Sequence, residues 1–117
     1  MEVLSITRNV KMAPQKMREV VRQIQGLPAQ HAVAVLAFVP RKGARVVAKT
    51  LQSAIANAED LKLHKAGYGG FNTDKLRVKE AVAQTAHTLK RFTPKARGSA
   101  GPVLKRHCHV RIVLSDE

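Results

Sequence analysis

The sequence predicts one α+β domain of three helices and three strands, from which a long basic β-hairpin protrudes. Apolar residues repeat at helical spacing in three stretches between residues 14 and 58, and they alternate with period two near the C-terminus. Residues 81–114 hold seven Lys or Arg and no Asp or Glu. The length of 117 residues fits a single domain. Such a chain can bury roughly two-thirds of its unfolded surface without disulfides or a metal.

The charge balance indicates a polyanionic partner. The chain has 21 Lys and Arg against 8 Asp and Glu, a net charge of +13, and self-repulsion of this size needs neutralising. Nucleic acid is the first candidate. An anionic membrane is the second, but no apolar run approaches the roughly 20 residues of a spanning helix, and no signal peptide is visible in MEVLSITRN. The single cysteine, Cys108, excludes an internal disulfide and fits a reducing compartment.

The first half of the chain predicts a short strand followed by three helices. Residues 3–7 are rich in β-branched types and predict the strand. The first helix is expected to begin at Pro14 and to stop at Gly26, which suits a left-handed end. The second runs from Pro28 to Pro40, and the third spans residues 41–58. The third carries the longest apolar stripe, formed by Ala44, Val47, Ala48, Leu51, Ala54, Ile55 and Ala58.

Residues 59–75 predict a linker, since Gly67, Gly69 and Gly70 loosen it, while Tyr68 and Phe71 are expected to pin it to the body. Its Gly-Tyr-Gly-Gly run lacks the G-x-x-x-x-G-K-[ST] pattern of a phosphate loop.

Two strands are expected to follow the linker and to pair as the arms of one hairpin. The first begins near Leu76, with Leu76, Val78, Glu80 and Val82 on one face and Arg77, Lys79, Ala81 and Ala83 on the other. In the last strand, the apolar row is Cys108, Val110, Ile112 and Leu114. The segment LKRFTPKARGSAGP between them predicts no regular structure by itself. We expect a body of residues 1–83 and 108–117 and an extended hairpin of residues 84–107.

The hairpin is expected to protrude and to bind RNA. Each arm has about ten residues beyond the sheet, so at about 3.3 Å per residue it can extend ~30 Å, whereas a globule of this size has a radius of gyration of about 13 Å. Phosphates from a partner would order it, and Phe92 can stack on a base. A solvated charged face explains any single basic residue, but the density of charge favours RNA contacts at Arg8, Lys11, Lys16, Arg18, Arg22, Arg41, Lys42, Arg45, Lys90, Arg91, Lys95, Arg97, Lys105 and Arg106.

Catalysis and metal binding are disfavoured. The run His107-Cys108-His109, with His87, suggests a metal or a Cys–His nucleophile, but adjacent strand residues point to opposite faces. Only His107 and His109 share a face, and two ligands fall short of a tetrahedral zinc site. We expect no enzyme, no metal and no cofactor, and we expect His107 and His109 on a polar strand face beside RNA or solvent.

Three segments, in order, resemble the universal large-ribosomal-subunit protein L-twenty-two family. They are APQKMREVVRQIQG, LQSAIANAED and LKRFTPKARGSAGPVLKRHCHVRIVLSD. The third is the most specific, because Pro94-Lys95-Ala96-Arg97-Gly98 precedes His109 and its alternating apolar row at the family's distance. The resemblance covers nearly the whole chain. It implies three helices packed on a small three-stranded antiparallel sheet, with a long hairpin extending from it.

The resemblance also implies a cytoplasmic location, in the large ribosomal subunit. The body would lie at the outer surface, and the hairpin would run through large-subunit rRNA and line the peptide exit tunnel, opposite ribosomal protein L-four. Nascent peptide would pass the tunnel-lining residues, namely Leu89, Lys90, Arg91, Arg97, Gly98, Ser99 and Ala100. Of these, Leu89 to Arg91 match the segment tied to macrolide response, and Arg97 to Ala100 match the tip.

Two positions depart from the family. Lys95 stands where the family usually has Arg, and Ser99 stands where it often has a basic residue. The linker around residues 68–72 is also longer than the typical bacterial one. The alternative function is a free-standing basic nucleic-acid-binding protein.

Overall fold

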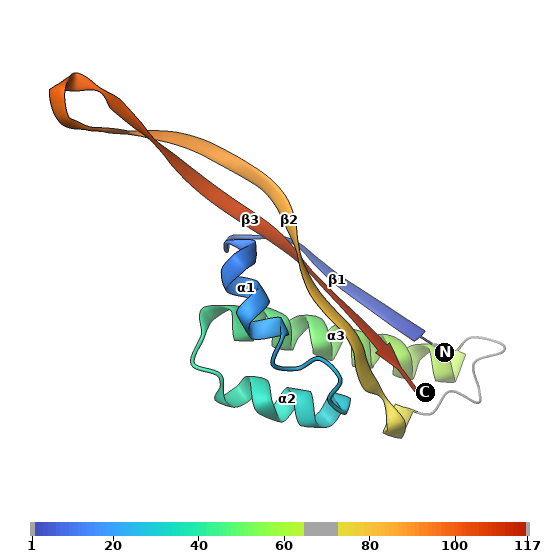
Figure 1. Cartoon of the computed structure of the whole chain (residues 1–117). Helices are drawn as coiled ribbons and strands as arrows, with labels where there is room; N and C mark the ends of the chain where they lie inside the picture. The colour runs from blue at the N-terminus through green and yellow to red at the C-terminus, as the bar shows by residue number, and fades with distance from the viewer. Residues whose placement is uncertain (1, 65–72, 117) are drawn as a thin grey trace.

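The elements follow the predicted order along an elongated molecule (Figure 1). A computed structural model describes residues 2–64 and 73–116. The elements are β1 (Glu2–Val10), α1 (Pro14–Val21), α2 (Ala29–Phe38), α3 (Lys42–His64), the 3-10 turn η1 (Thr73–Lys75), β2 (Arg77–Pro94), the 3-10 turn η2 (Ala96–Gly98) and β3 (Ala100–Ser115). The molecule measures 67 × 29 × 17 Å and its radius of gyration is 17.8 Å. A compact chain of this length has about 13 Å. The predicted α+β fold with a protruding hairpin is therefore confirmed.

The sheet is antiparallel with β3 in the centre, in the order β1-β3-β2. Both neighbours meet the end of β3 in the body, where Val3 and Val78 each pair with Leu114. Beyond the body only β2 and β3 continue, and their pairing reaches Pro94 opposite Ala100. The prediction of an irregular middle segment is therefore wrong for most of its length. Prolines are compatible with this ribbon because each strand has a free edge on which a missing N–H costs no ladder bond.

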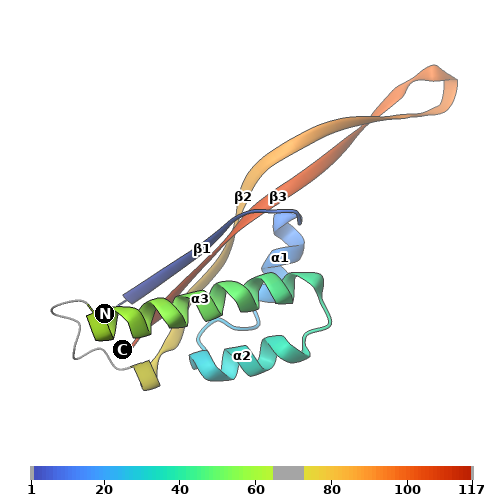
Figure 2. The same ribbon diagram turned by 180° about the vertical axis from the view of Figure 1, so that it is seen from behind.

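Three β-bulges bend the sheet. One lies between Val78 and Glu80 and exchanges the faces of β2. Val78 is buried before the bulge, and Ala81 and Ala83 are buried after it. The strict alternation predicted for this strand is therefore wrong beyond Val78. The other two lie between Thr7 and Val10 of β1 and between Thr85 and Thr88 of β2, on either side of the same stretch of β3. Bulges increase twist and bend a strand, and the hairpin leaves the body here (Figures 1 and 2).

The helix boundaries depart from the sequence predictions at two ends. Helix α1 begins at Pro14 as predicted but ends at Val21, although Gly26 has the expected positive φ of 78°. The chain leaves the helix early because Gly26 N donates to Val78 O at 2.9 Å, which joins this turn to the edge of β2.

Helix α3 continues to His64, so residues 59–64 are helical and the predicted linker begins too early. Leu61 packs against the core and holds these last turns, while Lys62 and His64 suit the negative end of the helix dipole. The positions proposed for Tyr68 and Phe71 lie outside the described residues.

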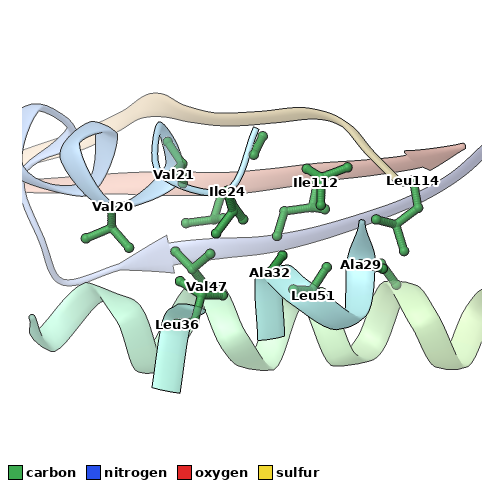
Figure 3. Packing of buried hydrophobic residues seen from close by; sticks show 14 of the residues in the cluster. Val20, Val21, Ile24, Ala29, Ala32, Leu36, Val47, Leu51, Ile112 and Leu114 are labelled. Carbon is green, nitrogen blue, oxygen red and sulfur yellow. The ribbon is translucent and has the colours of Figure 1, made fainter. Parts of the chain in front are cut away.

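The core lies between one face of the sheet and the helices (Figure 3). Helix α3 packs against β1 and β3, α1 packs against β2 and β3, and α2 packs on α3. Small residues on α3 allow this close approach, and Ala54 and Ala58 are fully buried. The predicted apolar row of β3 is confirmed, because Cys108, Val110, Ile112 and Leu114 are all fully buried. The body is thus a firm base for the hairpin.

Candidate nucleic-acid interface

Every basic residue that the sequence assigns to RNA contact is exposed. The structure divides them among a groove at the base of the hairpin, the junction of α2 and α3, the outer side of α1 and the hairpin itself. Arg8 lies near the bulge of β1, beside the point where the hairpin leaves the body. The basic side chains therefore spread from the hairpin over the adjoining end of the body.

A groove of about 620 Å³ lies between the base of the hairpin and the body, and we call it the junction groove. The loop before α1, the start of α3, and both strands of the hairpin line it. Its cations are Lys11, Lys16, Lys42, Lys105 and Arg106. Its other lining residues are Met12, Ala13, Leu89, Leu104 and His107. Side chains that are almost a hundred residues apart in the sequence thus form one positively charged concavity.

Helix N-termini add to the positive potential of the junction groove. Ala13 is the N-cap of α1 and makes no side-chain cap hydrogen bond, and Lys42 is the first residue of α3. Neither helix has an acidic residue in its first turn. Free backbone N–H groups and the positive end of the helix dipole both favour an anion at such a place.

Arg41 and Arg45 border a second hollow, of about 540 Å³, at the junction of α2 and α3. Arg41 Nη1 donates to Glu19 Oε2 at 2.8 Å, and both side chains are more than half exposed. An exposed ion pair of this kind contributes little to stability. It orients Arg41 across the gap between α1 and α3 and leaves its other guanidinium nitrogens available to a phosphate.

Arg18 has a structural partner that the sequence did not suggest. Its Nε donates to Ala83 O at 3.2 Å, and Gln25 Nε2 donates to Ala81 O. Both side chains therefore satisfy carbonyl groups on the free edge of β2. Arg18 anchors α1 to the sheet, whereas its neighbour Arg22 is exposed beside the same edge.

The predicted tunnel-lining residues fall at two separate places on the hairpin. Leu89, Lys90 and Arg91 pair with Lys105, Leu104 and Val103, partway along the ribbon. Residues 97–100 form the turn and its exit. Arg97 and Gly98 both have positive φ, 60° and 70°, and Lys95 N donates to Ser99 O at 2.7 Å. Two successive left-handed residues give a tight turn that matches strand twist, and Arg97 is the unusual residue there because it is not Gly or Asn.

His107 is not on an open polar face, contrary to the prediction. It is only 7% exposed, because its ring stacks on His87 across the bulge of β2. Its Nδ1 has no hydrogen-bond partner among the described residues. His109 is half-buried, and its Nδ1 accepts a hydrogen bond from Asn9 N at 3.0 Å. Next to the bulges, these side chains therefore lie against the rest of the protein rather than in solvent.

The Cys108 thiol is separated from both neighbouring histidines by the sheet and lies in the core. Burial raises the pKa of the Cys108 thiol, and the charge of Arg18 opposes this in part. Across residues 2–64 and 73–116, no three His, Cys, Asp or Glu side chains are close enough together to hold a metal ion. No helix in the same residues is long and apolar enough to cross a membrane.

Acidic residues are concentrated at the opposite end of the body. Apart from Glu19, the described carboxylates occur at the start of β1, in the last turns of α3, in η1, near the start of β2 and after β3; they are Glu2, Glu59, Asp60, Asp74, Glu80 and Asp116. These segments meet where the termini lie, at the end remote from the hairpin tip (Figure 1). The molecule is therefore electrically polar along its long axis.

Sequence reasoning missed the uncharged lining of the junction groove. Met12, Ala13 and Leu104 belong to it, and none of the three was assigned to the interface. One available signal was the presence of Leu89 and Leu104 in an otherwise basic and polar arm with little core to support. The other lining residues could not be identified, because the segments that form the groove lie far apart in the sequence.

The fold and interface define a class, namely small basic proteins built around a long hairpin that projects from an α+β body. A family model described as Ribosomal protein L22p/L17e matches residues 5–115, and the chain belongs to this family. It is 48% identical over 116 residues to the large ribosomal subunit protein uL22 of Opitutus terrae, covering 99% of this chain and 96% of that one.

Two further relatives carry the same name. The protein of Finegoldia magna is 40% identical over 99% of this chain and 97% of its own length, and that of Chloroflexus aggregans is 41% identical over 100% and 97%. Membership of this family makes the chain a structural, non-enzymatic ribosomal protein.

Proposed function

We propose that the protein is a structural constituent of the large subunit of the cytoplasmic ribosome, where it binds large-subunit rRNA, supports subunit assembly and lines the nascent-peptide exit tunnel with its hairpin. One observation carries the proposal. An acid-free hairpin and the basic junction groove form a continuous cationic surface, and the carboxylates lie at the other end. Its partners are rRNA and neighbouring ribosomal proteins.

The mechanism is charge neutralisation by a preshaped arm. Lys90, Arg91, Lys105 and Arg106 lie on adjacent rungs of the ribbon and are exposed. Each phosphate that they contact releases condensed counterions, which favours binding at low salt. Arginine can also grip a phosphate with two hydrogen bonds, whereas Lys95 acts as a point charge. RNA segments that would repel one another can then pack on both sides of the hairpin.

The tunnel role assigns different tasks to the two ends of the hairpin. The flanks from Leu89 to Arg91 and from Lys105 to Arg106 contact rRNA, and the turn at residues 97–100 faces the passing peptide beside ribosomal protein L-four. The family resemblance supports this orientation. The turn is also the part of the hairpin farthest from the body, so rRNA can enclose the flanks and leave the turn at a cavity wall.

Binding to transcribed large-subunit rRNA, measured by filter retention at several salt concentrations, tests the rRNA contact. We expect the triple variant Lys90→Ala, Arg91→Ala and Lys105→Ala to reduce the slope of log affinity against log salt by about two, since each phosphate contact contributes about 0.7 to 0.9. The matched control is Lys62→Ala, Lys75→Ala and Arg77→Ala, three exposed cations at the acidic end of the body. Equal slopes for the two triple variants would contradict the proposal.

A cross-linking experiment tests the tunnel role. Because native Cys108 is buried, Ser99→Cys introduces the reactive thiol at the turn. We expect a thiol reagent to join it to a nascent chain stalled in the ribosome. The control Ser53→Cys, exposed on α3, should give no such product. If the protein is instead a free-standing binder, it will not co-sediment with large subunits at high salt.

A further inference from the structure

We propose that the junction groove holds one unpaired nucleotide of the RNA, with its phosphate on the cations and its base on the apolar lining. The inference rests on the proposed rRNA binding and specifies which part of the RNA this site takes. The groove, of about 620 Å³, falls within the 300–1,000 Å³ that is usual for small-molecule sites. A duplex is too wide to enter it, whereas a nucleotide turned out of a strand fits.

The cations that would bind the phosphate come from three separate elements of the structure. Lys11 and Lys16 flank the start of α1, Lys42 begins α3, and Lys105 and Arg106 come from β3. Among the described residues that line the groove none is acidic. Five cations around one concavity repel one another, and an anion held between them, beside the starts of α1 and α3, relieves this repulsion.

The apolar lining distinguishes a nucleotide from a phosphate alone. Leu89 is 39% exposed and Leu104 is 44% exposed, although both lie on a hairpin whose other long side chains are mostly charged. Met12 lines the same groove from the body side and is half-buried. A phosphate backbone needs only cations, but the face of a base gains contact with flexible apolar side chains. In a duplex both faces are already stacked, so the base must be unpaired.

His107 adds an aromatic ring to the lining of the junction groove. It lines the groove and is buried, yet its Nδ1 has no hydrogen-bond partner in the described part of the chain. Buried polar atoms are nearly always hydrogen-bonded. This nitrogen has almost no exposed surface, so a ligand in the groove contacts the ring of His107 rather than its Nδ1. The nucleotide therefore provides both an anion for the cations and a flat surface for the apolar and aromatic lining.

Methyl-group NMR of the full-length protein tests the site directly, with adenosine 5′-monophosphate, adenosine and inorganic phosphate as probes. We expect the monophosphate to shift the methyl resonances of Met12, Leu89 and Leu104, at a concentration about tenfold lower than either adenosine or phosphate. Leu51, in the core, and Leu63, exposed at the far end of α3, are the internal controls. If phosphate alone shifts the methyl resonances of the groove residues as strongly, the proposed contact between a base and the apolar lining is wrong.

Binding of transcribed large-subunit rRNA provides the second test. We expect Leu104→Ser to weaken binding about tenfold with an unchanged salt slope, because base stacking is lost and no charge is removed. Leu63→Ser, also an exposed leucine, should bind like the wild type. Both sites are at the surface, so neither change threatens folding.

If Leu104→Ser binds rRNA normally while the triple variant of Lys90, Arg91 and Lys105 still reduces the salt slope, the proposed nucleotide site is wrong and the proposed rRNA binding stands. If neither variant changes binding, the proposed function itself fails.

Discussion

His87 and His107 stack with their ring centroids 4.3 Å apart and their planes 18° apart, across the bulge where the hairpin leaves the body. The stack joins the two strands at the place where the third strand ends. A bulge alone removes a ladder bond and loosens the ribbon. The paired rings restore a contact there, so that the hairpin has a defined direction relative to the helices.

The first prediction concerns this stack. We expect His87→Ala to destabilise the fold by about 1 kcal/mol, the typical worth of an aromatic pair, and to speed amide exchange from Leu89 to Arg91. Urea unfolding and hydrogen exchange measure the two effects. His31→Ala, an exposed histidine on α2, is the control. Unchanged exchange in the hairpin would show that the stack does not hold it.

The second prediction concerns the hydroxyl pair that ties α3 to β1. Thr7 Oγ1 and Thr50 Oγ1 lie 2.5 Å apart, and Thr50 Oγ1 also donates to Val46 O at 2.9 Å. Thr50→Val keeps the shape and removes the hydroxyl, which leaves Thr7 without this partner. We expect a loss of about 1 to 2 kcal/mol in the free energy of unfolding. Ser53→Ala, exposed on the same helix, should change it by less than about 0.5 kcal/mol.

The third prediction is a pH dependence from Cys108. Because burial raises the pKa of this thiol in the folded state, the neutral form is favoured by folding. Its contribution to stability is complete below the ordinary thiol pKa of about 8.5 and is lost as the pH rises through the folded pKa. The stability difference between wild type and Cys108→Ala should therefore shrink in alkali.

A thiol reagent provides a second readout for Cys108. The native protein should react slowly at pH 8 and rapidly in urea. Fast reaction of the folded protein would mean that Cys108 is accessible and would contradict the burial argument.

The fourth prediction concerns the hairpin turn. Arg97 has φ 60° and ψ 32°, a left-handed conformation that costs a side-chain-bearing residue about 1 kcal/mol. Arg97→Asn should ease the turn and slow amide exchange from Lys90 to Thr93. Arg91→Asn removes the same charge without relieving the turn and serves as the control. Equal exchange rates in the two variants would show that the turn is not strained.

Much of the fold could be predicted because its signals are local. The helical stripe on α3 and the alternation in β3 are properties of neighbouring residues, and both are confirmed. The boundaries that failed depend on distant partners. Helix α1 ends early because Gly26 bonds to Val78, and the faces of β2 exchange at a bulge that only its pairing with β3 reveals.

The interface divides in the same way. Charge counting identified exposed cations correctly, since exposure is the rule for Lys and Arg. It could not tell that Arg18 anchors a strand edge, or that Lys11, Lys42 and Lys105 share one groove. Burial of His107 also depends on His87 and on the bulge opposite it. These features need the tertiary structure because each joins segments that are far apart in the chain.

The separation of charge along the molecule affects how quickly the protein finds its site, as well as how tightly it binds. Because cations are concentrated on and beside the hairpin, whereas the charges near the termini largely cancel, the protein has an electric dipole along its 67 Å axis. The field of a polyanion exerts a torque on such a dipole and turns the hairpin forward before contact. Productive collisions then become more frequent, and the association rate falls steeply as salt shortens the range of the field.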